Sequence, residues 1–392
     1  MVFYKKFNLS RLVENLSKSL DLILNGSPSN HALRVSFICI LISYQMNFKL
    51  NERINLYLAG LLHDIGAVER ETQLLLEYDK RDCVDLQRHA IVGYEILKKI
   101  PLFEEIALIV KDHHNPASNN LLSRIIYFAD EVEVLLRREN LFEPKTLKAK
   151  IYPLYKNRPM FSDILDAFVE VIRNDAFFIM LSNVEEIKKY FVSHVEEKIV
   201  SVDAELFNRL AKSIAESFID KKSKFTLTHS SDVAKTALAI ARQVGLSNKD
   251  CKTIETAGFL HDIGKLFVPK SILEYPGKLS GNDWLRMKSH VYYTYSFLNQ
   301  MELDEDIIHI ASSHHEYLDG SGYPFGLNRN DLSTGAQILT VADIYSALRQ
   351  KRPYRSNSFS HQEALEVLIG MANKGKINRD FIKAIPSDVL DI

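Results

Sequence analysis

LAGLLHDIGA at residues 58–67 and TAGFLHDIGK at residues 256–265 are two copies of one motif, an apolar stretch that ends in adjacent histidine and aspartate. Further histidines and one further aspartate repeat around each copy in the same order. The first set is His31, His63, Asp64, His89, His113, His114 and Asp130, and the second is His229, His261, Asp262, His290, His314, His315 and Asp343. In both sets 32 residues separate the lone histidine from the His-Asp pair, and 24 separate the next histidine from the His-His pair. The chain therefore contains an internal duplication.

Imidazole and carboxylate are ligands that suit divalent transition metals. A single histidine is usually a surface or hydrogen-bonded core residue, so we assign no role to His194, His309 or His361. Ten of the 13 histidines, however, recur in register in the two halves. Packing does not demand imidazole at equivalent positions of two domains. The pattern therefore predicts a metal site in the second half and a further metal site in the first.

The fold class follows from the spacing of the apolar residues. They recur at helical intervals in segments such as 92–100, 233–245 and 364–372, and clear strand alternation is largely absent. A length of 392 residues suffices for two ordinary domains. We predict an all-α protein with two tandem helical bundles, and we place the junction near residue 200, giving domains 1–200 and 201–392.

Composition excludes several classes of protein. With 49 basic and 50 acidic residues the net charge is −1, which predicts no attraction to nucleic acid polymers or anionic membranes. The longest apolar run, 35–46, is too short to span a bilayer, and the N-terminus lacks a signal-peptide pattern. The three cysteines are scattered, which argues against a disulfide framework or a zinc cluster. We expect a cytoplasmic protein, and the sequence leaves a homodimer open.

The second set supplies five imidazoles and two carboxylates, which is more than one ion with an open position needs. Adjacent His261 and Asp262 can address two neighbouring ions, with the carboxylate of Asp262 as the bridge. Two-metal sites generate a hydroxide at neutral pH and clamp both ends of an in-line displacement at phosphorus. We therefore predict two divalent ions and phosphoester hydrolysis. Iron and manganese accept the same ligands, so the sequence does not choose between them.

Residues around the second set are suited to a phosphate substrate. Lys265 lies three residues beyond the bridging carboxylate, where its ammonium could neutralise a phosphoryl oxygen or protonate the leaving oxygen. The segment 319–324, DGSGYP, predicts a shaped loop beside the metals, and its Tyr323 offers an aromatic face to a base. Arg352 and Arg355, in RPYR, are suited to bidentate phosphate contacts.

In this order HDIGK, HHEYLDGSGYP, VADIY and KRPYR resemble the HD-GYP family of HD-domain phosphohydrolases, over residues 220–360. VPKSILEYPGKL at 268–279 is similar to that family's link after the HD motif. The resemblance implies a binuclear, sometimes trinuclear, iron or manganese site and hydrolysis of cyclic di-GMP to linear pGpG or GMP. It implies that the second set ligates metal, that Lys265 and Asp262 are catalytic, and that substrate contacts come from Asp319, Gly322, Tyr323, Arg352 and Arg355.

The sequence departs from the HD-GYP pattern at two places. Phe225 stands where some members carry a glutamate ligand for a third metal, which favours two ions. The usual glycine after the middle histidine is also missing, since the stretch from Tyr292 to Tyr295 contains none.

The first half is similar to the wider HD superfamily over residues 25–140. Every ligand position is filled, but Ala67 replaces the lysine and the stretch between the His-His pair and the last aspartate is 12 residues shorter. We therefore interpret this half as a structural or sensory metal site. Two alternatives remain for the whole chain: hydrolysis of another nucleotide such as cyclic GMP-AMP, and a ligand or oxygen sensor without turnover.

Overall fold

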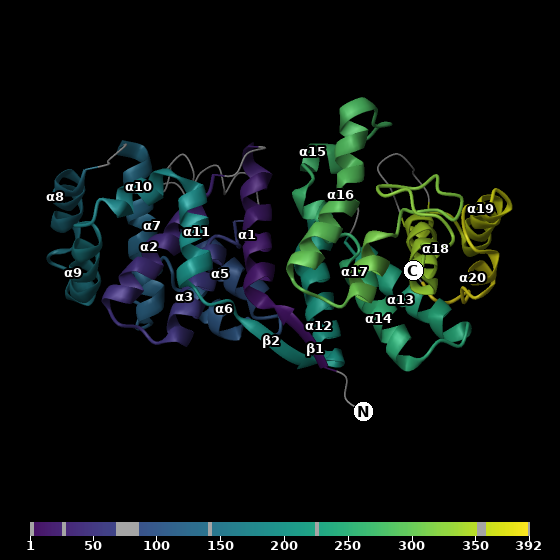
Figure 1. Cartoon of the computed structure of the whole chain (residues 1–392), viewed down its shortest axis with the longest axis horizontal. Helices are drawn as coiled ribbons and strands as arrows, with labels where there is room; N and C mark the ends of the chain where they lie inside the picture. The colour runs from purple at the N-terminus through teal and green to yellow at the C-terminus, as the bar shows by residue number, and fades with distance from the viewer. Residues whose placement is uncertain are drawn as a thin grey trace. The chain divides into compact units, whose positions relative to one another are not determined.

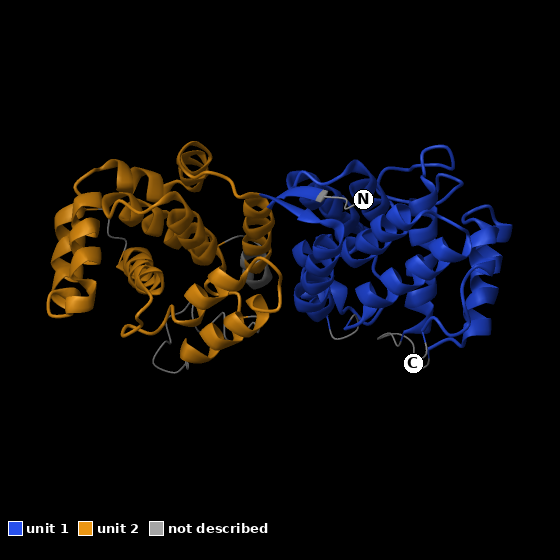
Figure 2. Ribbon diagram, turned by 90° about the horizontal axis from the view of Figure 1, so that it is seen from below, with its two compact units in different colours: residues 1–8, 200–392 blue, residues 9–199 orange. Residues whose placement is uncertain are grey.

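The computed structural model describes residues 4–25, 29–67, 86–139, 143–223, 227–350 and 358–390. The chain divides into two compact units (Figure 2). The N-terminal unit is Leu9–Ile199. The C-terminal unit begins at Val200 and includes strand β1 (Tyr4–Asn8). The sequence assigned β1 to the N-terminal domain, but its pairing with β2 (Ile199–Asp203) places it with the other unit.

Helices make up almost all of the regular secondary structure in both units, which confirms the all-α class (Figure 1). The N-terminal unit contains α1 (Leu9–Asn25), α2 (His31–Gln45), α3 (Leu50–Leu62), α5 (Leu86–Leu97), α6 (Glu104–Lys111), α7 (Leu121–Glu139), α8 (Pro144–Tyr155), η2 (Pro159–Phe161), α9 (Ser162–Val171), α10 (Ala176–Ser182) and α11 (Val184–His194). The C-terminal unit contains α12 (Ala204–Ile214), η3 (Ala215–Ile219), η4 (Asp220–Lys222), α13 (His229–Gln243), α14 (Asn248–Leu260), η5 (Ile263–Phe267), α15 (Lys270–Leu273), α16 (Gly281–Gln300), α17 (Glu305–Ser312), α18 (Thr334–Arg349), α19 (His361–Asn373) and α20 (Arg379–Lys383). Among the described residues, none of these helices combines the length and apolar character needed to cross a membrane.

The duplication is visible in the matching helices of the two units. α2 and α13 each have 15 residues and begin at a histidine of the repeated set. α3 and α14 each have 13 residues and end immediately before the His-Asp pair. In each unit these two helices pack against one another, and α7 or α18 packs against the first of them. Equal helix lengths therefore explain the equal spacing in the sequence. The packing of these helices brings together the lone histidine, the His-Asp pair and the last aspartate of each set.

The glycine after each His-Asp pair allows an unusually close backbone approach. A Cβ atom on Gly264 would lie 1.9 Å from the carbonyl oxygen of His290 and 2.5 Å from the amide nitrogen of Thr294. A Cβ on Gly66 would lie 1.9 Å from the carbonyl oxygen of His89. Only glycine permits these contacts. They hold the turn that carries the His-Asp pair against the helix that carries the next histidine.

We predict that Gly264→Ala lowers the free energy of unfolding by about 3 kcal/mol, because the added methyl group must displace backbone atoms of α16. Urea denaturation would measure the change. Gly370→Ala is the matched control: this glycine lies within α19 with open space around the position of a Cβ. Alanine there should stabilise the protein by about 0.5–1 kcal/mol. Equal stabilities of the two variants would contradict the close-approach explanation.

Candidate metal centres

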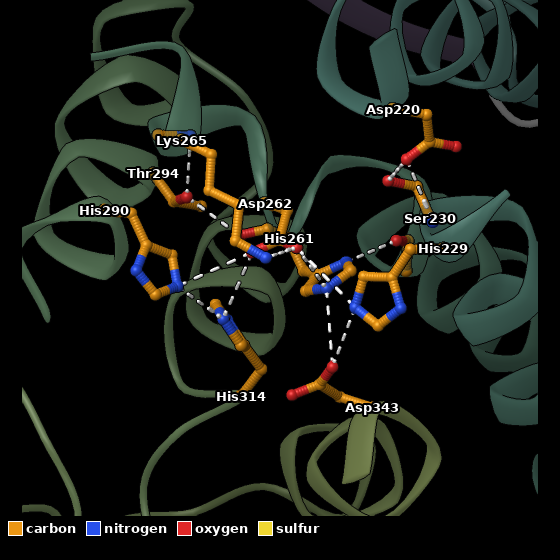
Figure 3. Close-up of polar contacts among 12 residues, drawn as sticks. Asp220, His229, Ser230, His261, Asp262, Lys265, His290, Thr294, His314 and Asp343 are labelled. Atoms are coloured by element: carbon orange, nitrogen blue, oxygen red, sulfur yellow. Dashed lines mark hydrogen bonds and ion pairs between the residues drawn. The ribbon is translucent and has the colours of Figure 1, made fainter. Parts of the chain in front are cut away.

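The seven residues of the second set lie together inside the C-terminal unit, and all of them except His315 are labelled in Figure 3. Two of them lie inside helices, His290 in α16 and Asp343 in α18. The others lie at helix ends: His229 opens α13, His261 and Asp262 follow α14, and His314 and His315 follow α17. The side chain of His315 is 25% exposed, whereas the other six are buried. The set therefore forms an internal polar cluster with one more accessible imidazole.

Asp262 lies between two groups of imidazoles (Figure 3). Its Oδ2 is 3.3 Å from Nε2 of His261 and 3.7 Å from Nε2 of His229. Its Oδ1 is 3.5 Å from Nε2 of His290 and 3.8 Å from Nε2 of His314. One carboxylate oxygen thus faces each group. This is the arrangement that a bridging ligand between two ions requires.

Asp343 completes the first group and reaches toward the second. Its Oδ1 is 3.1 Å from Nε2 of His229, and its Oδ2 is 3.7 Å from Nδ1 of His315. The ligand atoms accordingly fall into one potential ion position at His229, His261 and Asp343 and a second at His290, His314 and His315.

Backbone contacts orient three of the imidazoles for metal binding. In each, Nδ1 lies 2.6–2.7 Å from the carbonyl oxygen three residues earlier: His261 to Gly258, His290 to Met287 and His314 to Ala311. A carbonyl accepts only, so Nδ1 carries the proton and donates it. Nε2 then carries no proton, and its lone pair points into the cluster. Metal-ligating histidines are typically fixed in this way.

The bare Nε2 atoms of His290 and His314 lie 3.3 Å apart with no proton to share between them. Nε2 of His261 and Oδ1 of Asp262 are buried and have no well-aligned hydrogen-bond partner in the described part of the chain. Burial lowers the pKa of His290 to about 3 and that of His315 to about 4, so both rings are neutral at neutral pH. The facing lone pairs of these nitrogens and the buried carboxylate oxygen are what a site for divalent cations would present.

Lys265 reaches the same carboxylate. It lies on η5, and its ammonium forms an ion pair with Oδ2 of Asp262, so the turn brings it back to the cluster as the sequence predicted. Burial by itself would raise the pKa of Asp262. The neighbouring His261 and Lys265 outweigh burial and hold that pKa well below its usual range. Asp262 is therefore an anion at neutral pH and can bridge two cations.

Two residues that position the ligands were missed by sequence reasoning. Asp220, buried in η4, accepts hydrogen bonds from the backbone nitrogen (3.1 Å) and hydroxyl (2.7 Å) of Ser230, and so anchors the start of α13 beside His229. Thr294 lies four residues after His290, at the position that Gly93 has after His89. Its hydroxyl accepts from the amide of Gly264 (3.1 Å) and donates to the carbonyl of His261 (2.8 Å). Thr294 thus ties the HD turn to α16 by hydrogen bonds.

The loop after His315 is held by Glu316, whose buried carboxylate sequence reasoning also overlooked. It accepts hydrogen bonds from the backbone amides of Phe325 (2.7 Å), Gly326 (3.2 Å) and Leu327 (3.1 Å). Gly322 packs so closely that a Cβ would lie 2.4 Å from Cα of Glu316. These contacts fold the loop back onto the His-His pair.

The predicted substrate residues have different surroundings. The ring of Tyr323 lies 4.9 Å from that of His315, between centroids, at an interplanar angle of 35°. Asp319 is exposed and accepts hydrogen bonds from the amide (3.0 Å) and hydroxyl (2.7 Å) of Ser321, which form a local turn. Arg352, Arg355 and Phe225 lie outside the described residues.

The first set forms a matching cluster in the N-terminal unit: His31, His63, Asp64, His89, His113, His114 and Asp130. Oδ1 of Asp64 is 3.1 Å from Nε2 of His89, and Oδ2 is 3.4 Å from Nε2 of His63. The Nε2 atoms of His113 and His114 each lie 3.2 Å from that of His89. This cluster too can hold divalent ions.

The surroundings of the first cluster differ from those of the second. Ala67 occupies the lysine position, and the side chain of Asp64 is 28% exposed, against 2% for Asp262. Glu133, buried one turn after Asp130, lies 2.6 Å from Nδ1 of His31. A carboxylate on the outer nitrogen of a histidine directs Nε2 toward a metal and raises its basicity. The first centre thus has a full set of ligands, and alanine stands where the second centre has Lys265.

Two family models, both described as HD domain, match residues 29–135 and 196–380. The chain therefore belongs to the HD-domain family, with one HD domain in each half. The curated relatives include "Cyclic di-GMP phosphodiesterase response regulator RpfG" from Xanthomonas campestris, which is 37% identical over 42% of both chains. The resemblance of the second half to the HD-GYP branch is confirmed.

Other relatives match nearly the whole chain. "3'3'-cGAMP-specific phosphodiesterase 1" from Vibrio cholerae is 27% identical and covers 96% of this chain and 91% of its own length. A crystal structure of a cyclic GMP-AMP-specific phosphodiesterase from the same organism covers 97% of both chains, with a TM-score of 0.61 and 21% identity. The tandem arrangement of two helical units is therefore the fold of that structure as well.

We predict that the purified chain carries more than two metal ions, because both clusters have a full ligand set. Elemental analysis of His261→Ala and of His63→Ala should each show partial loss of metal. His194→Ala is the control, since this histidine is exposed, outside both clusters and stacked on Tyr190. Unchanged metal content in His63→Ala would show that the first cluster holds none.

Proposed function

We propose that this chain is a metal-dependent phosphodiesterase that opens a cyclic dinucleotide, and that the reaction takes place at the C-terminal centre. The observation that carries the proposal is the carboxylate of Asp262 between two groups of imidazole nitrogens, with the ammonium of Lys265 on the same carboxylate. Two divalent ions bound there would supply Lewis-acid charge and a water nucleophile for displacement at phosphorus. The ligands proposed are the seven residues of the second set.

The protein's own residues would perform the remaining steps. Water adds to the phosphorus, the bond from phosphorus to the 3' oxygen breaks, and that oxygen takes a proton. The ammonium of Lys265 is placed to hold a phosphoryl oxygen or to donate that proton. Asp262 stays ionised, because its pKa is held well below its usual range. Arg352 and Arg355 remain proposed phosphate contacts on the strength of the sequence.

The identity of the bases is a separate question. The HD-GYP resemblance favours cyclic di-GMP, with pGpG or GMP as product. The relatives that span most of the chain favour 3'3'-cGAMP, because two of them carry that specificity in their names and cover 96% and 89% of this chain. We therefore propose both as substrates to be compared directly.

We propose a different role for the N-terminal centre. Its ligands are complete, yet Ala67 stands at the position of the proposed catalytic lysine, and the chain continues after His114 without the glycine-proline loop. We infer that this centre binds metal for structural or sensory purposes and does not hydrolyse the substrate.

Chromatography of reaction products tests the proposed function. Incubated with iron or manganese without oxygen, the metal-replete chain should convert cyclic di-GMP, 3'3'-cGAMP or both to linear products, and chelation of the metal should stop the reaction. His261→Ala should lose this activity, while His63→Ala should retain most of it. A metal-replete chain that leaves both dinucleotides intact would contradict the proposal.

We predict that Lys265→Ala lowers kcat by about 100- to 1,000-fold, the scale for losing one donor to a transition state. Metal content should change little, because seven ligands remain. Lys270→Ala is the matched control: it removes an exposed lysine of α15 and should leave kcat unchanged. Full activity in a metal-replete Lys265→Ala protein would refute the catalytic role of this lysine.

A further inference from the structure

A line of aromatic rings leads outward from the C-terminal centre. The ring of Tyr323 lies against the ligand His315, and Trp284 meets Tyr323 at 5.9 Å between centroids and an interplanar angle of 74°. Trp284 lies in the first turn of α16, six residues before the ligand His290. Its side chain is 42% exposed. The indole is thus a large apolar surface left open to solvent, two ring contacts from a proposed metal ligand.

In this geometry Tyr323 is not well placed to be the ring on which a base stacks. The sequence indicated Tyr323 as the stacking surface, but His315 lies against its ring and the indole meets it nearly edge to face. Tyr323 therefore acts as a spacer that supports Trp284. In a nucleotide one ribose separates the base from the phosphate. A surface one ring beyond the metal ligands suits a base whose phosphate lies on the metals.

A cation accompanies the two rings. Nζ of Lys288, one helical turn after Trp284, lies 6.0 Å from the indole centroid and 5.8 Å from the centroid of Tyr323. Its side chain is half-buried. Lysine only donates hydrogen bonds. A base stacked on the indole would therefore present its edge to a donor, and guanine offers two acceptors there, O6 and N7, where adenine pairs N7 with an amino donor.

We propose that Trp284 and Lys288, supported by Tyr323, form a subsite that binds a guanine of the substrate. The proposal rests on the proposed function, because it places the phosphodiester of the same molecule on the C-terminal centre. It also accounts for both candidate substrates, since cyclic di-GMP and 3'3'-cGAMP each contain guanine. Cyclic di-AMP contains none and should bind poorly.

Trp284 is the one tryptophan of the chain, so its fluorescence reports directly on this subsite. The experiment uses metal-replete Lys265→Ala protein, in which slow turnover preserves the complex. Cyclic di-GMP and 3'3'-cGAMP should quench the tryptophan emission with saturation, and cyclic di-AMP should bind at least about tenfold more weakly. Lys288→Met in this background should abolish that preference.

Kinetics in the otherwise native chain provide the second measurement. Trp284→Leu should raise KM for the guanine dinucleotides by about tenfold or more, the scale for losing one base-stacking contact, and should change kcat less. Trp284→Phe, which retains a ring, should recover most of the affinity. Tyr152→Leu, at a similarly exposed tyrosine (46%) of the N-terminal unit, is the control and should leave KM unchanged.

The outcomes separate this inference from the proposed function. Hydrolysis by wild type, Trp284→Leu and Lys288→Met with equal KM would overturn the subsite and leave the phosphodiesterase intact. Saturable quenching without any hydrolysis by wild type would support the subsite and overturn the phosphodiesterase. Bis-p-nitrophenyl phosphate has no nucleobase. If Trp284→Leu lowered kcat/KM for this compound as much as for the guanine dinucleotides, Trp284 would have a structural role and the subsite would be overturned as well.

Discussion

The structure of the C-terminal unit depends on burying an aspartate among histidines. An unpaired carboxylate in a protein interior costs several kcal/mol, so Asp262 must be surrounded by compensating groups. Imidazoles supply them only if their rings are turned correctly, and here backbone carbonyls three residues earlier set the ring orientation. Ligand placement is therefore coupled to the local geometry of helix ends. This coupling explains why α2 and α13, and α3 and α14, keep equal lengths in the two units.

The same coupling decides what could be predicted from the sequence. The helical class and the clustering of ligands followed from residue type and spacing, because the ligands lie within or at the ends of helices whose periodicity is plain. Thr294, Glu316 and Asp220 could not be found that way. Each acts through a tertiary hydrogen bond to backbone that spacing does not reveal. Strand β1 was missed because its five residues are too few to show alternation, and its partner β2 is almost 200 residues away.

The two centres share their ligands and differ in what surrounds them. Ala67 replaces Lys265, Asn115 stands at the position of Glu316, and Glu133 stands at the position of Ser346. Loss of a catalytic lysine need not be followed by loss of the ligands, because each ligand removed would leave the others buried without partners. In the first unit Glu133 strengthens the hold on His31. Retention of a complete set of ligands in a centre with alanine at the lysine position is therefore what the energetics of burial predict.

In the proposed reaction, chemistry and recognition would be carried by different parts of the C-terminal unit. The ligands and Lys265 would contact only groups that every phosphodiester possesses, so they would not distinguish one base from another. Discrimination must come from side chains beyond the cluster, and the loop held by Glu316 and the exposed start of α16 are the described segments adjacent to it. A buried cluster tolerates little change, whereas Trp284 and Lys288 lie at the surface, where substitution costs little stability. Base preference can therefore change among proteins of this fold while the metal centre stays the same.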